Sequence, residues 1–324
     1  MWGLARARLR ALPGPLQGAI LMTIAAGAFA GMNVLIRALS FELHPFQISF
    51  LRVVGSLVFM LPWLAHAGIS ALASASHKLY LSRTIVGYIS MLCWFTSLAI
   101  LPVSEATALS FTSPLFATAA AALLLGEIVR ARRWTATIVG FLGAMVVIRP
   151  GFQAVELAHV LVLVSAALGG WNAITVKQLT KTDAPNVIVI YMTLYLTPVS
   201  LLPALFVWQW PSLEAWLMVA LLGLCGTIGH QTFTRALAVC EASYVLPFDF
   251  ARLPMVAFIA YFAFAETPDP WTWVGGGIIV ASTVYIARRE AKLSRLTPPA
   301  ATASETGTVA KRPDPAQAGA KGVE

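Results

Sequence analysis

The 324-residue sequence has few charged side chains: 11% of its residues are Asp, Glu, Lys or Arg, whereas 58% are apolar. A soluble domain carries about 25% charged residues and about 45–50% apolar ones. Acidic residues are especially scarce, with 14 against 22 basic ones, so the formal net charge is +8. Nucleic-acid-binding proteins gather Lys and Arg on a hydrophilic face, which this chain lacks. The composition therefore argues against a soluble enzyme or a DNA-binding module and predicts a chain embedded in lipid.

Cysteine and the common catalytic motifs are also scarce. Cys93, Cys225 and Cys240 all lie in apolar runs and predict neither a disulfide framework nor a zinc motif. The sequence contains no GxxxxGK[ST], HExxH, CxxC or GxSxG, so it shows no signature of P-loop, zinc or serine chemistry. We therefore expect no cofactor and no metal. An intramembrane enzyme is the alternative of another class, with Asp249 and His230 as its candidate pair.

Long apolar runs fill most of the chain. A transmembrane helix needs ~20 mostly apolar residues to cross ~30 Å of hydrocarbon. The length and continuity of the runs favour helices over a β-barrel, whose strands are short and alternate in polarity. We therefore expect an all-α integral membrane protein with ten transmembrane helices. The ten predicted spans are Leu16–Ile36, Phe46–Leu64, Leu79–Leu98, Val103–Leu125, Trp134–Val147, Leu157–Val176, Val187–Val207, Leu213–Ala238, Ala242–Ala263 and Trp271–Ile286.

The cations are distributed unevenly between the two sides of these spans. With a cytoplasmic N-terminus, the inner side receives fifteen cations, Arg83 among them, and the outer side receives Arg37 and Arg149. The positive-inside rule then predicts a multi-pass protein of the cell membrane, in bacteria the inner membrane, with both termini cytoplasmic. Residues 1–15 form a basic N-terminal segment, and residues 288–324, rich in Pro, Ala and Gly, a disordered cytoplasmic tail.

An internal repeat becomes visible when the sequence is aligned with itself at an offset of 139 residues, the spacing between Asn33 and Asn172. This offset places the five early spans on the five late ones without a gap. It also matches Glu127 with Glu266, Trp134 with Trp273, and Phe111 with Phe250. Five spans are an odd number, so the second unit must enter the membrane from the opposite side. We expect two inverted five-helix repeats, 16–149 and 157–287, an arrangement typical of transporters.

Several short motifs recur in order along the two halves. The first half has PFQISFLR (45–52), SEATALSFTSPL (104–115), Gly126-Glu127 and a run of Trp134, Gly140 and Gly143; the second has ASYVLPFDFARLP (242–254), Glu266 and Trp273. Over residues 16–287 this set resembles the EamA-type family of the drug/metabolite transporter superfamily. The resemblance implies a ten-helix fold of two inverted units that moves small metabolites such as amino acids, nucleotide-related compounds or vitamins.

Two charged residues lie in the ninth predicted span, where the first repeat has the uncharged Ser110 and Ser113. Asp249 and Arg252 are three residues apart and therefore share a helix face. Arg252 lies ~15 Å from the start of its span, and Ser113 is equally deep from the opposite side. A charge at such a depth costs about 2.5–3.5 kcal/mol on insertion scales. Either Arg252 binds an anionic substrate group, with Asp249 as its partner or a proton carrier, or the two form an ion pair that locks the bundle.

Other polar and aromatic residues complete the candidate site. Asn33 and Asn172 occupy equivalent places, where an amide serves either helix packing or a cavity lining. The predicted substrate-binding residues are Asn33, Trp94, Ser110, Ser113, Trp171, Asn172, His230, Asp249 and Arg252. The residues expected to be structural are Arg52, Glu127 and Glu266. Arg52, ~9 Å into its span, is expected to reach the outer interface or a helix end, and the two glutamates loops or helix ends.

The sequence thus predicts a secondary transporter that moves a small polar or zwitterionic metabolite, amino-acid-like or related, by alternating access. The alternative substrate is a nucleoside-like or vitamin-like compound that is taken up. A structural or sensory membrane protein is a further alternative. The expected partners are the small-molecule substrate, the lipid bilayer and a coupling ion, H+ or Na+, but no nucleic acid.

Overall fold

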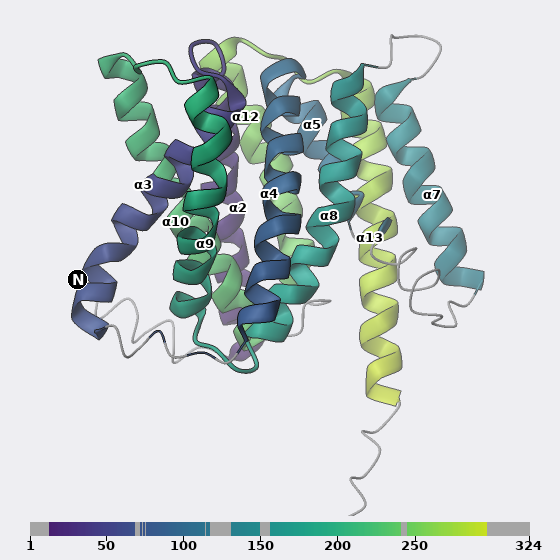
Figure 1. Cartoon of the computed structure of the whole chain (residues 1–324). Helices are drawn as coiled ribbons and strands as arrows, with labels where there is room; N and C mark the ends of the chain where they lie inside the picture. The colour runs from purple at the N-terminus through teal and green to yellow at the C-terminus, as the bar shows by residue number, and fades with distance from the viewer. Residues whose placement is uncertain are drawn as a thin grey trace, which may run out of the picture.

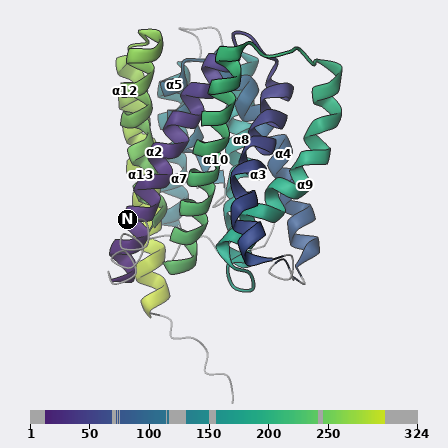
Figure 2. The same cartoon turned by 90° about the vertical axis from the view of Figure 1, so that its left-hand side faces the viewer.

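The computed structural model describes residues 13–68, 72, 74, 76–113, 115–116, 131–149, 156–240 and 245–296, and all regular elements among them are helical. The helices run side by side as one bundle with their connections at its two ends (Figures 1 and 2). In chain order they are α2 (Gly14–Leu39), α3 (Pro45–Ala67), α4 (His77–Ile100), α5 (Val103–Ser110), α7 (Ala131–Ile148), α8 (Leu157–Leu179), α9 (Pro185–Phe206), α10 (Leu213–Val239), η2 (Leu246–Ala251), α12 (Arg252–Phe264) and α13 (Pro270–Leu296).

Seven helical stretches in the described part are long and apolar enough to cross a membrane. They are α2, α3, α4, α8, α9, α10 and the combined stretch Leu246–Phe264, and Trp134–Ile148 is a shorter apolar helix. Large apolar side chains also cover the outside of the bundle, with Phe206 89% and Phe262 71% exposed. So much exposed apolar surface suits lipid rather than water. The chain is an all-helical, multi-pass membrane protein, and the predicted count of ten spans stays a prediction.

Close helix contacts are made by glycine. A Cβ atom on Gly223 of α10 would lie 2.7 Å from the carbonyl carbon of Gly55 in α3. On the far flank of the bundle, a Cβ on Gly275 of α13 would lie 2.6 Å from the backbone oxygen of Gly143 in α7. Helices in lipid gain stability from such close backbone approach, because water supplies no hydrophobic force between them. The two crossings hold opposite flanks of the bundle.

Polar contacts join the helix connections at each end of the bundle. The α2–α3 and α9–α10 connections lie at the upper end in Figure 1. Gln47, in the first turn of α3, donates to the carbonyl of Gln209 (2.5 Å), which ties the start of α3 to the α9–α10 connection. At the lower end, the Tyr80 hydroxyl donates to Asp183 (2.7 Å), which ties α4 to the α8–α9 connection. We call these the α2–α3 end and the α8–α9 end. Connections alternate between them, as expected for a chain that crosses the membrane repeatedly.

Two predicted spans are not continuous helices. The ninth, expected over Ala242–Ala263, has the 3-10 helix η2 before α12 begins at Arg252. The fourth, expected over Val103–Leu125, leaves the α-helix after Ser110 and turns at 111–112, and its later part lies outside the described residues. Proline explains both breaks: Pro114 and Pro254 have no N–H to donate to the carbonyls of Ser110 and Phe250 four residues earlier.

The start of the predicted C-terminal tail also differs. Residues 288–296 were expected to belong to a disordered segment, but α13 continues as a helix to Leu296. The sequence ARREAKLSRL at this point consists mostly of strong helix formers, which lets the helix extend beyond its apolar part. Residues 297–324 and 1–12 lie outside the described part of the chain.

Candidate functional site

The break between η2 and α12 positions the two charged residues of the predicted site. Arg252 Nη2 lies 2.8 Å from Asp249 Oδ2, and each side chain is 17% exposed. The guanidinium carbon of Arg252 also lies 5.4 Å from the ring centre of Phe111 and 5.9 Å from that of Phe29, within cation–π range. Asp249 Oδ1 and Arg252 Nε have no hydrogen-bond partner among the described residues. The ion pair therefore forms and still leaves one acceptor and one donor for a ligand.

Aromatic rings from three elements surround this pair. Phe111, after α5, and Phe250, in η2, meet edge to face with ring centres 4.8 Å apart. Phe29 of α2 meets the His230 ring of α10 at 5.2 Å, also edge to face. His230 is thereby placed one ring away from Arg252. This arrangement presents flat apolar faces beside two charges, which suits a ligand that is itself flat and carries polar atoms.

Asn33 is the centre of a buried hydrogen-bonded group on α2, α4 and α5. Its Oδ1 accepts from Trp94 Nε1 (3.3 Å), and its Nδ2 donates to Thr107 Oγ1 (3.5 Å). Ser110 donates to the carbonyl of Thr107 (2.7 Å). Because Asn33 lies four residues after Phe29, both side chains share a face of α2. The structure thus brings Asn33, Trp94 and Ser110 together with the aromatic rings around Arg252.

The residues predicted on α8 lie differently. Asn172 faces Gly87 of α4, where a Cβ would be 3.5 Å from its amide atoms, and its Oδ1 has no partner among the described residues. Ser113 Oγ lies 3.6 Å from the position of a Cβ on Gly169. Trp171, in contrast, is 52% exposed on the outside of the bundle. Asn172 and Ser113 therefore lie at the contact of α8 with its neighbours, whereas the structure does not bring Trp171 into the buried group.

Arg52 and Arg83 are buried inside the bundle, although each was expected at an interface. Arg52 is 3% exposed and its Nη1 lies 3.7 Å from the sulfur of Met91, while Arg83 is 7% exposed and its Nη2 lies 3.3 Å from the sulfur of Met192. Neither has a carboxylate within ion-pair distance in the described part of the chain. Arg52 therefore does not reach the outer interface, and Arg83, which was counted with the cations of the inner side, lies buried in α4.

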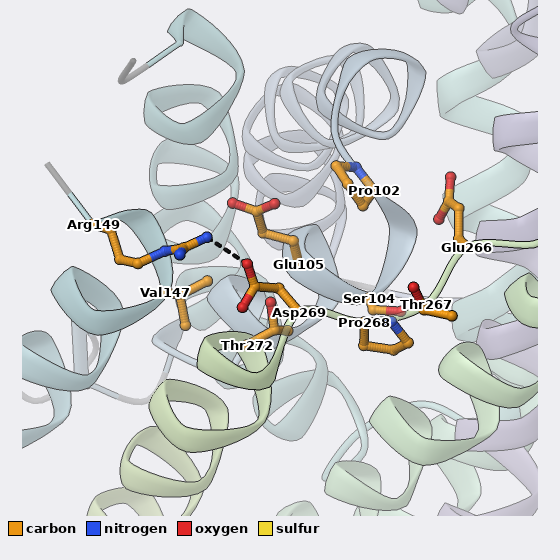
Figure 3. A pocket seen from close by; sticks show the side chains of 10 residues that line it. All are labelled: Pro102, Ser104, Glu105, Val147, Arg149, Glu266, Thr267, Pro268, Asp269 and Thr272. Atoms are coloured by element: carbon orange, nitrogen blue, oxygen red, sulfur yellow. Dashed lines mark hydrogen bonds and ion pairs between the residues drawn. The ribbon is translucent and has the colours of Figure 1, made fainter. Parts of the chain in front are cut away.

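A small cavity of about 180 Å³ lies at the α2–α3 end of the bundle, lined by residues from α5, α7 and the α12–α13 connection (Figure 3). Arg149 forms an ion pair with Asp269 across it (2.5 Å), and Glu105 beside this pair bonds to His159 of α8 (3.0 Å). Glu266 accepts from the backbone N–H of Val103 at the start of α5 (3.2 Å) and pairs with Arg37 (3.8 Å). These contacts join the two halves of the chain at this end.

Sequence reasoning missed three members of the buried group, and it did not identify Arg83, outside that group, as a buried cation. Phe29 and Thr107 gave no signal, because a phenylalanine or threonine in an apolar run is ordinary. Phe111 was visible as a repeated position but was not read as part of the site. Arg83 stood inside the predicted span Leu79–Leu98, and that position alone could have identified it as a membrane-buried cation. Glu127 lies outside the described residues. The described residues include no group of three or more His, Cys, Asp or Glu able to hold a metal.

Comparisons with known proteins agree on one family. The model of the EamA-like transporter family matches residues 16–149 and again 156–288. A riboflavin transporter of Vibrio cholerae is 35% identical over 87% of this chain and 96% of its own length, and one of Rhizobium johnstonii is 31% identical over 86% and 93%. An S-adenosylmethionine uptake transporter of Rickettsia felis is 30% identical over 80% and 88%. A solved crystal structure shares the fold, with a TM-score of 0.62 at 17% identity over 84% of this chain and 98% of the other.

Proposed function

The chain belongs to the EamA-like transporter family, and from this premise we propose that it takes up a metabolite with a flat heteroaromatic ring, of the riboflavin type. It is a transporter of a small metabolite and not an enzyme. The vitamin-like alternative thereby replaces the amino-acid-like substrate as the first choice. Support comes from the relatives named riboflavin transporters, which the chain matches over nearly their whole length.

The observation that carries this proposal is the pair of buried Asn33 and half-buried Trp94 beside the rings of Phe29 and Phe111. A flat heteroaromatic ring binds by stacking on aromatic side chains, and an amide pairs with its ring carbonyl and N–H groups. Asn33 offers both a donor and an acceptor and lies on the helix face of Phe29. Burial keeps water from competing for these groups, so the amide discriminates between ring edges.

An S-adenosylmethionine-type metabolite is the second candidate, because it joins a heteroaromatic ring to an amino-acid head. The specific observation is the Asp249–Arg252 pair, whose opposite charges match the ammonium and carboxylate of a zwitterion. Asp249 Oδ1 and Arg252 Nε each have no partner among the described residues and would bind such a head. The same carboxylate oxygen is our candidate position for a coupling proton. In this form the amino-acid-like substrate predicted from the sequence is retained.

We further propose ten spans in two inverted repeats, 16–149 and 157–287. The offset of 139 residues pairs α2 with α8 and α4 with α10, and correspondingly α2 packs on α10 while α8 packs on α4. Elements that are counterparts of each other also pack together, α3 on α9 and α7 on α13. Phe111 meets its counterpart Phe250, as expected of equivalent residues near a pseudo-two-fold axis. Two such halves can exchange conformations and open a shared site to either face in turn.

The proposed orientation puts the α2–α3 end outside and both termini in the cytoplasm. The ion pairs Arg37–Glu266, Arg149–Asp269 and His159–Glu105 then close the outer end. Opening to the outside requires these pairs to separate, and the hydration of the released charges offsets part of that cost. The pairs thus serve as the outer closure in alternating access.

The test is uptake of radiolabelled riboflavin into proteoliposomes that contain the full-length protein. We expect saturable uptake, absent from protein-free liposomes, and a loss of about tenfold or more in Trp94→Ala, which removes a stacking surface and the donor to Asn33. Trp210→Ala is the matched control, because Trp210 is 80% exposed and lies in the α9–α10 connection. Absence of riboflavin uptake by correctly inserted protein would overturn the proposal, and uptake of S-adenosylmethionine in its place would support the second candidate.

A further inference from the structure

Two arginines in the membrane-embedded part of the bundle lack an oxygen partner. The four other arginines whose side chains the structure describes all contact oxygen: Arg37 and Arg149 pair with carboxylates, Arg235 donates to Asn186 and Arg252 pairs with Asp249. In the described part, the only hydrogen-bond acceptors of Arg52 and Arg83 are the thioether sulfurs of Met91 and Met192. A thioether is a weak acceptor and cannot neutralise a cation. The described part of the chain supplies no carboxylate within ion-pair distance of either arginine.

The positions of Arg52 and Arg83 in the bundle make the lack of a negatively charged partner more significant. Arg52 lies seven residues into α3, ~10 Å from the α2–α3 end, and Arg83 lies six residues into α4, ~9 Å from the α8–α9 end. They approach the middle of the bundle from opposite ends and interact electrostatically with each other and with His230. Like charges brought together in a low dielectric repel strongly. Two buried arginines so arranged indicate an anion that joins them.

Donor groups around the pair are free to receive such an anion. Arg52 Nε and Arg83 Nη1 are buried and have no hydrogen-bond partner among the described residues. Gly226 of α10 leaves the space in which Arg52 lies, since a Cβ there would be 3.3 Å from Arg52 Nε. Met91 and Met192 have flexible side chains that can withdraw from the guanidinium groups without breaking a strong bond. Arginine is also the cation best suited to bind an oxyanion through two parallel N–H groups.

We propose that Arg52 and Arg83 form a subsite for an oxyanion, a phosphate or carboxylate group, borne by the transported metabolite. The subsite rests on the proposed uptake function and adds to it that the metabolite is anionic. It assigns to Arg52 a role in binding in place of the structural one expected from the sequence. His230 meets the Phe29 ring edge to face and lies within electrostatic range of both arginines, which links the subsite to the aromatic group around Arg252. A ring bound there and an anionic tail bound between the arginines form one elongated substrate.

The test compares riboflavin with its 5′-phosphate, which share a ring and differ by one phosphate group. Binding is measured on the purified full-length protein in detergent, with inorganic phosphate as a third ligand and the ionic strength held constant. We expect the phosphate ester to bind at least about tenfold more tightly than riboflavin, since charge-assisted hydrogen bonds are worth that much. Arg52→Gln and Arg83→Gln should each bring the ester down to the affinity of riboflavin, and the two lysine variants should keep part of the preference.

A stability readout separates binding from a structural role. Without ligand, the melting temperature of Arg52→Gln and Arg83→Gln should equal or exceed that of the wild type, because each removes an uncompensated buried charge. Arg235→Gln is the charge-matched control on α10 and should keep the preference for the ester. The subsite would be overturned by two results together: a marked fall in the melting temperature of both glutamine variants, and a preference for the ester that the lysine and glutamine variants all keep. The arginines would then serve helix packing.

The outcomes also separate the subsite from the proposed function. If riboflavin binds and its phosphate binds no better, the subsite is wrong and the uptake proposal stands. If riboflavin fails to bind but inorganic phosphate raises the melting temperature of the wild type and not of the arginine variants, the ring assignment is wrong and the subsite stands. If no ligand binds, both are wrong.

Discussion

At the scale of single residues, the membrane makes each polar group informative, because an unsatisfied one costs more there than in water. Asn33 and Asp249 were predicted from their rarity in apolar runs, and the structure gives each a partner. The pairing of Asp249 with Arg252 was expected, because the two are three residues apart. The partners of Asn33 were not predictable, because Trp94 and Thr107 belong to other helices. Which residue faces which depends on the rotation of each helix about its axis, and helices that are apolar all round carry no sequence signal for rotation.

The Asp249–Arg252 pair allows a test of the two roles left open by the sequence. Asp249→Asn leaves Arg252 without its counter-charge, and breaking a buried ion pair costs about 3–5 kcal/mol, so the melting temperature should fall. The double variant Asp249→Asn/Arg252→Gln removes both charges, and much of that stability should return. We expect both the single and the double variant to lack uptake, because the Arg252 guanidinium and its counter-charge are required to bind the substrate. Recovery of both stability and uptake, measured by thermal unfolding and by flux, would show that the pair only locks the bundle.

At the scale of helices, the spans were predictable, because length and continuous apolar composition are local properties of the sequence. The breaks within the fourth and ninth spans were only partly predictable. Pro114, Pro247 and Pro254 marked where hydrogen bonds are lost, but proline can also kink a helix that continues. η2 also packs on α2, which is remote in sequence, and such contacts are not visible in the local pattern. The end of α13 was predicted too early, because the sequence becomes polar before the helix ends.

The α3–α10 crossing provides a test of helix packing. Gly223→Ala would place a methyl group 2.7 Å from the backbone of Gly55, so the helices must separate, and overpacking of this kind costs about 1–3 kcal/mol. We expect a lower melting temperature and, because Arg52 lies on α3 one turn from the crossing, weaker binding of the phosphate ester. Gly277→Ala is the matched control, since nothing lies within 4 Å of its added Cβ. Equal melting temperatures for the two alanine variants would contradict the close crossing.

At the scale of the whole molecule, the helix contacts concern the symmetry of the two halves, and the charge distribution concerns their orientation in the membrane. The counterpart contacts of α2 with α10 and α8 with α4 support two halves related by an axis in the membrane plane, but such an axis leaves the in–out direction undetermined. We expect the direction to follow from the cations, which the sequence places mainly on the side of the termini, under the positive-inside rule. On this interpretation the net charge of +8 mainly reflects topology, whereas Arg52, Arg83 and Arg252 are the arginines that we propose to bind the substrate.

The orientation can be measured with single cysteines. Glu156, before α8, and Lys181, after it, are both exposed and lie at opposite ends of the same helix. In a background without Cys93, Cys225 and Cys240, a membrane-impermeant maleimide applied to intact cells should label Glu156→Cys and not Lys181→Cys. Labelling of both after the cells are opened is the control for reactivity. The reverse pattern in intact cells would invert the molecule, and the ion pairs of Arg37 and Arg149 would then close the cytoplasmic end instead of the outer one.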